Sequence, residues 1–131
     1  MPVQSSTEVV ERIVRHPEGF SGLFRRMHYV PFLPLLELPH TKVTQDLRQA
    51  FSACGLTDSD FQTVSLSELV AFALRLSSDK WAGLAVRWLS DGFPLDADIA
   101  RAGDEMVTAK RGSQANRHAL FRMIRQWERS R

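Results

Sequence analysis

The sequence has one cysteine and no long hydrophobic run, and each shortage excludes a class of protein. Cys54 alone cannot build an internal disulfide framework, which is compatible with a reducing compartment. No apolar stretch approaches the roughly 18 residues that a membrane-spanning helix needs. The N-terminal segment MPVQSSTEVVER lacks a basic region followed by an apolar core, so it does not predict a signal peptide. We therefore expect a cytoplasmic protein that does not enter the membrane.

The motifs of common enzymes and metal sites are also missing. The sequence contains no GxSxG, P-loop or GxGxxG. The histidines are far apart and have no metal-ligand spacing; they are His16, His28, His40 and His118. Cys54 falls on an apolar helical stripe, which favours a buried structural role over a nucleophile. We expect a protein that is not an enzyme and that binds no metal or cofactor.

One interhelical turn is rich in aspartate, with Asp91, Asp96 and Asp98 close together. Their spacing is not that of an EF-hand. Asp96 and Asp98 precede and open an apolar-periodic segment, where carboxylates cap the first turn and suit the positive helix dipole. Capping therefore explains this turn better than a cation site.

Signals for β-strands are absent too, whereas the 3.6-residue period of helices recurs along the chain. Helix starts are marked by capping residues at Ser5, Thr57, Ser65, Ser78, Asp96 and Ser113. The connections between these segments are short, which favours antiparallel neighbours. The sequence predicts that residues 1–131 form a single all-α domain of about six or seven short helices, as a bundle or a short solenoid-like stack.

Small residues on the predicted helix that Asp96 caps suggest that another element packs closely against it. Ala102 and Gly103 share the inner face of that helix with larger apolar residues. The preceding helix carries Trp81 and Trp88. We expect one of these tryptophans to lie against the small residues.

Residues 30–39, VPFLPLLELP, combine three prolines with strongly apolar side chains. Proline lacks an N–H and clashes with the preceding helical turn, so one uninterrupted α-helix is excluded. One interpretation is a kinked connector pressed onto the core, with a short helical turn after Pro34. The other is an exposed apolar ridge that docks a partner through Phe32 and Leu33.

The basic residues are concentrated at the end of the chain. Residues 1–100 hold 9 Lys/Arg and 12 Asp/Glu, a net charge of −3, whereas residues 101–131 hold 8 and 3, a net charge of +5. At about 100° per residue, four cationic or titratable side chains fall on one side of the last helix, opposite its apolar stripe. These four are His118, Arg122, Arg125 and Arg129, and Lys110, Arg111 and Arg117 could extend the group.

Unpaired like charges at this spacing cost a helix a few tenths of a kcal/mol per pair, so helix stability does not explain the basic stripe. Three interpretations remain: a solvated face balanced by carboxylates elsewhere in the fold, a site for an acidic protein partner, or a site for nucleic-acid phosphates. No aromatic residue is expected among these cations, which argues against stacking on single strands. We expect a non-enzymatic protein that docks onto or occludes a macromolecular partner, possible forms including an immunity-type inhibitor of a bacterial toxin. The alternative is a nucleic-acid-binding accessory protein.

Overall fold

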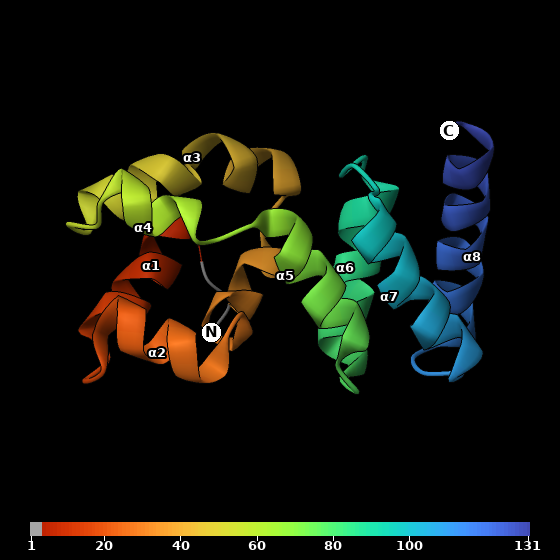
Figure 1. The fold of residues 1–131 in the computed structure, drawn as a ribbon, viewed down its shortest axis with the longest axis horizontal. Helices are drawn as coiled ribbons and strands as arrows, with labels where there is room; N and C mark the ends of the chain where they lie inside the picture. Colours follow the sequence, from red (N-terminus) through yellow and green to blue (C-terminus); the bar gives the residue numbers. More distant parts are fainter. Residues whose placement is uncertain (1–3) are drawn as a thin grey trace. The chain divides into compact units, whose positions relative to one another are not determined.

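The computed structural model describes residues 4–131, so the first three residues of the N-terminal segment discussed above lie outside it. Residues 4–131 contain eight α-helices, one 3-10 helix and no strand, which confirms the all-α class (Figure 1). The number exceeds six or seven because the short α4 and the 3-10 helix η1 are separate elements. The helices are α1 Ser6–Arg15, α2 Gly19–Met27, η1 Val30–Glu37, α3 His40–Ala53, α4 Asp58–Gln62, α5 Leu66–Arg75, α6 Asp79–Ser90, α7 Ala97–Thr108 and α8 Gln114–Arg129.

The chain divides into two compact units, residues 1–66 and residues 67–131. That the two units form one domain stays a prediction. No helix in the described part of the chain has the length and apolar character needed to cross a membrane.

The capping residues explain where most helices begin. Ser5, Ser78 and Ser113 accept hydrogen bonds from backbone N–H groups three residues later. The carboxylate of Asp96 accepts one from the Ile99 N–H at 2.8 Å. A capping side chain of this kind typically stabilises a helix by about 1 kcal/mol. These four predicted starts are confirmed.

An aromatic cluster fills the core of the first unit. Phe32 is fully buried, and its ring centroid lies 6.1 Å from that of Phe20, 5.9 Å from that of Phe24 and 6.3 Å from that of Phe51. Leu33 is only 4% exposed. The hypothesis that Phe32 and Leu33 form an exposed docking ridge is therefore wrong. Edge-to-face and offset ring pairs add to the hydrophobic stabilisation of such a core.

The proline-rich segment reaches that core as a 3-10 helix, which is longer than the single turn expected after Pro34. A 3-10 helix bonds each N–H to the carbonyl three residues earlier. Phe32 N–H donates to the Tyr29 carbonyl at 2.9 Å, and Leu38 N–H donates to the Leu35 carbonyl at 3.0 Å. The prolines thus prevent an α-helix but still allow a tighter helix that buries four apolar side chains.

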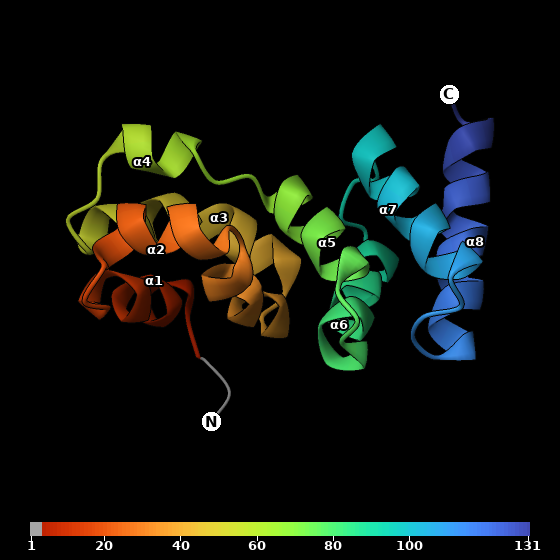
Figure 2. The same cartoon turned by 60° about the horizontal axis from the view of Figure 1, so that its bottom comes forward.

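In the second unit, α7 and α8 lie side by side, and α6 also packs on α8 (Figure 2). A Cβ added to Gly103 of α7 would come within 2.7 Å of Ile124 and 3.1 Å of Leu120, both on α8. The neighbours of Gly103 are therefore Ile124 and Leu120 of α8. The expectation that a tryptophan of α6 lies against the small-residue face of α7 stays a prediction. Trp88 packs edge-on against Phe93, with ring centroids 5.4 Å apart.

Candidate functional site

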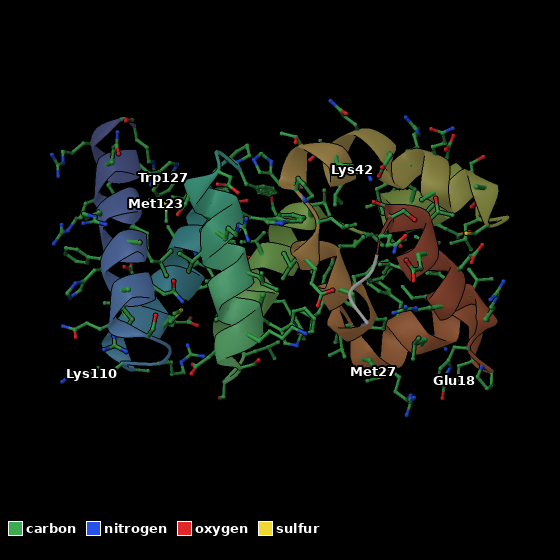
Figure 3. The ribbon with its side chains drawn as sticks, turned by 180° about the vertical axis from the view of Figure 1, so that it is seen from behind. Glu18, Met27, Lys42, Lys110, Met123 and Trp127 are labelled. Atoms are coloured by element: carbon green, nitrogen blue, oxygen red, sulfur yellow. The ribbon has the colours of Figure 1, made fainter. Side chains whose placement is uncertain are left out.

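One side of α8 packs on α7 and α6, and the other side faces solvent. Leu120 and Ile124 are buried against α7, and the Ser90 hydroxyl of α6 contacts the Met123 sulfur at 3.9 Å. Figure 3 labels Met123 and Trp127 on α8, and Lys110 in the turn that precedes it. The packing of this apolar side determines which residues of α8 face solvent.

The four residues predicted from the helical period all lie on the solvent-facing side of α8. Each is exposed: His118, Arg122, Arg125 and Arg129. Within residues 4–131, no carboxylate lies within ion-pair distance of any of the three arginines. The three arginines therefore have no direct ion-pair partner among the described residues, and a solvated face balanced by more distant carboxylates stays one interpretation.

One exposed aromatic residue on this side was not anticipated. Phe121 is 44% exposed, and the Arg125 guanidinium lies 5.0 Å from the centroid of its ring. Phe121 is about 60° from His118 around the helix and about 110° from the middle of the apolar stripe. That angle was available from the sequence and would have placed Phe121 beside the cations. The expectation that no aromatic residue accompanies the cations is wrong.

We call the exposed side formed by His118, Phe121, Arg122, Arg125, Gln126 and Arg129 the outer face of α8. It contains a shallow open depression lined by five of these residues, all except His118. A second depression lies on the other side of Phe121 and Arg125, where Asp104 of α7 and Glu128 of α8 contribute carboxylates. Phe121 and Arg125 therefore separate a basic depression from a mixed one.

Arg117 and Arg111 each donate hydrogen bonds to backbone carbonyls. The Arg117 guanidinium donates to the Gly112 carbonyl and, at 3.2 Å, to the Lys110 carbonyl. These carbonyls lie in the turn after α7, where a cation interacts favourably with the negative end of the helix dipole. The Arg111 guanidinium donates to the Arg75 carbonyl at 2.7 Å, which ties the same turn to the end of α5. Both arginines thus have structural hydrogen bonds in the second unit, and their assignment to the binding surface stays a prediction.

Lys110 is exposed and has a positive φ of 55°, in the left-handed region at the end of α7. That region is usually occupied by glycine or asparagine. The backbone conformation of the turn between α7 and α8 therefore determines where Lys110 lies. Nothing places its side chain on the outer face of α8.

Cys54 has the surroundings of an unreactive thiol. It is half-buried, and its Sγ lies 3.9 Å from the Thr7 carbonyl. Burial raises the pKa of the thiol, the negative charge of Glu11 raises it further, and Arg15 opposes this with a lowering effect. Because the thiolate is the nucleophilic form, a raised pKa disfavours covalent chemistry at neutral pH.

Among residues 4–131, no three His, Cys, Asp or Glu side chains are grouped closely enough to hold a metal ion. Asp96, which the sequence assigned to capping, does cap α7, and Asp98 pairs with Arg75 at 3.5 Å. Both carboxylates thus have structural partners in the second unit.

No protein-family model, curated protein sequence or solved structure matches this chain.

Proposed function

We propose that the protein is a non-enzymatic binding protein that docks the outer face of α8 onto an acidic surface of a protein partner. The observation that carries the proposal is the set Arg122, Arg125 and Arg129, which is exposed, aligned on one helix face and without carboxylate partners among the described residues. Aligned like charges disfavour the helix slightly when it is alone. A partner carboxylate removes that repulsion and gains charge-assisted hydrogen bonds.

The composition of the face supports a protein partner. Arginine and aromatic side chains are enriched at protein interfaces, and they supply most binding hot spots. Phe121 offers exposed apolar area beside the arginines of the face, and Arg125 lies over its ring. An apolar anchor surrounded by charged groups is the arrangement in which truncating one residue strongly reduces affinity.

In this proposal the protein acts in the cytoplasm by occlusion, covering an active or binding surface of its partner. An immunity-type inhibitor of a bacterial toxin is one form of that function. The support for this narrower form is the small size of the chain and its lack of recognisable catalytic motifs. The acidic partner surface is supported by the charges of α8.

The alternative is a nucleic-acid-binding accessory protein, and Phe121 is the observation in its favour. An aromatic ring among arginines can stack on an exposed base. Single-strand binding grooves usually present several aromatic side chains along the strand, whereas this face presents one. The protein partner therefore remains the proposal.

The experiment is recovery of the tagged protein from cells that express it naturally, followed by identification of bound protein and nucleic acid. The test variant is Arg122→Glu with Arg125→Glu. Its matched control is Arg87→Glu, which reverses an exposed charge on α6 of the same unit. We expect the wild type and the control each to recover an acidic protein and no nucleic acid. The test variant should recover at least tenfold less of that protein.

A second arm distinguishes the alternative by titrating the purified protein with a 20-base-pair DNA duplex and a 20-nucleotide single strand. Four phosphate contacts would weaken DNA binding about 150-fold between roughly 50 and 200 mM salt. Salt-dependent DNA binding that is lost in the test variant would show that the partner is nucleic acid and not protein. If the test variant recovers as much of the acidic protein as the wild type does, the outer face of α8 does not bind the partner.

A further inference from the structure

A second candidate site lies in the first unit. An open depression there is lined by residues of α2 and of the α4 region: Phe20, Ser21, Phe24, Arg25, His28, Asp60 and Thr63. It is mainly apolar at its base and polar at its rim. An apolar base with a few directional polar groups is the usual composition of a small-molecule site.

Two stacked phenyl rings form the apolar base. The centroids of Phe20 and Phe24 are 5.7 Å apart, with an interplanar angle of 12°. Phe20 is 7% exposed, and Phe24 is half-buried. Phe24 also contacts Tyr29 edge-on at 5.4 Å, so its ring is held from behind. A flat apolar group can pack on these rings without displacing the core.

The rim carries a guanidinium, an imidazole and one carboxylate. Arg25 and His28 of the α2 segment are exposed, and no carboxylate within residues 4–131 forms an ion pair with either side chain. Asp60 is the acidic residue of the rim, and its Oδ2 already accepts hydrogen bonds from the Thr57 N–H at 2.9 Å and the Thr57 hydroxyl at 3.0 Å. The Arg25 guanidinium, which has no ion-pair partner among the described residues, is therefore the group of the rim that can bind an anionic ligand.

His28 occupies a backbone conformation that ordinarily belongs to glycine. Its φ is 52° and its ψ is −118°, where it ends α2 through a 2.7 Å hydrogen bond from its N–H to the Phe24 carbonyl. A side chain in this region is strained, and such strain is often found at ligand sites. Glycine would end the helix with less strain, but it would remove the imidazole from the rim.

We propose that this depression binds a small aromatic carboxylate. The aromatic ring of the ligand packs on Phe20 and Phe24, and its carboxylate accepts hydrogen bonds from Arg25 and His28. Guanidinium and carboxylate groups match in geometry, because two parallel N–H donors meet two oxygens. The site is independent of the outer face of α8.

The probe is 3-phenylpropionate, titrated into the full-length protein and followed by backbone amide NMR. We expect saturable shifts that are largest in α2 and α4. The neutral probe 3-phenylpropanamide and the cationic probe 3-phenylpropylamine should each bind at least tenfold more weakly. No saturable shift in α2, or equal binding of the amide or the amine, would overturn the proposal.

Two variants test the assigned residues. Arg25→Gln should weaken 3-phenylpropionate binding at least tenfold, whereas the matched control Arg26→Gln should not, because Arg26 pairs with Glu18 at 3.0 Å. His28→Gly should raise the midpoint of thermal unfolding and still weaken binding. Unchanged binding in Arg25→Gln or His28→Gly would overturn the assigned contacts. The double variant Arg122→Glu with Arg125→Glu should bind the probe normally, so this site and the α8 surface are tested separately.

Discussion

The Arg125 guanidinium of α8 lies 5.0 Å from the ring centroid of Phe121, one helical turn earlier. A cation over an exposed ring is attracted by about 0.5–1 kcal/mol. The contact restricts a side chain that would otherwise sample many rotamers, so less conformational entropy is lost when Arg125 binds a partner carboxylate. This pair is part of the proposed docking surface.

Phe121→Ala should separate binding from folding. Phe121 is 44% exposed, so its truncation should change the free energy of unfolding by less than about 1 kcal/mol. Because Phe121 is an apolar anchor, its truncation should weaken the recovered partner complex at least tenfold, corresponding to about 1.4 kcal/mol or more. Urea unfolding and isothermal titration with the recovered partner measure the two quantities. Full affinity in Phe121→Ala would show that the ring is not an anchor.

Arg117 and Arg122 should respond differently to the same substitution. Arg117→Ala removes charge-assisted hydrogen bonds to carbonyls of the turn after α7, so we expect a loss of about 1–3 kcal/mol in unfolding free energy. Arg122→Ala removes no hydrogen bond or ion pair within residues 4–131 and should change it by less than about 0.5 kcal/mol. Chemical denaturation of both variants gives the comparison. Equal effects would contradict the separation of structural from binding arginines.

The close approach of α7 and α8 depends on the absence of a side chain at Gly103. Gly103→Val would force Ile124 and Leu120 to move, because even a Cβ there comes within 2.7 Å of Ile124. Overpacking of this kind costs about 1–3 kcal/mol. The matched control is Gly83→Ala on α6, whose Cβ would meet only the Asn116 amide nitrogen at 3.2 Å. We expect thermal unfolding to show a lower midpoint for Gly103→Val, and an unchanged or higher midpoint for Gly83→Ala.

Cys54 should react slowly with alkylating reagents in the folded protein. Burial is the main cause that raises its pKa, so the thiolate fraction at pH 8 is below that of an ordinary thiol. Iodoacetamide should therefore modify the native protein more slowly than the urea-unfolded chain. Because the folded-state pKa is raised, the associated stability is present at neutral pH and is lost as pH rises above the unfolded value. Alkylation at equal rates in both states would contradict this environment.

The sequence determined helix starts better than helix packing. Ser78, Asp96 and Ser113 identified their helices because capping depends on residues within one turn. The contact of Gly103 with Leu120 and Ile124 depends on how two helices pack, and small residues alone do not specify their partner. The 3-10 helix of residues 30–37 was missed because prolines indicate what a segment cannot form more clearly than what it does form.

The candidate site was predictable in part for the same reason. His118, Arg122, Arg125 and Arg129 share a face by helical periodicity alone. Arg117 lies about 100° from His118 around the helix, outside that face, and the tertiary position of the turn after α7 shows that its guanidinium is used for capping. Phe121 was missed although its angle was known, because apolar residues of an amphipathic helix are usually assigned to its buried side.

Site-specific photo-cross-linking tests the central claim most directly. A photoreactive residue replaces Gln126, which lines the basic depression of α8, or Gln62 of α4 as a control. In cells that express the protein naturally, position 126 should cross-link to an acidic protein that position 62 does not capture. Arg122→Glu with Arg125→Glu should abolish that product. Identical products from both positions, or a position 126 product that survives the double substitution, would contradict docking through the outer face of α8.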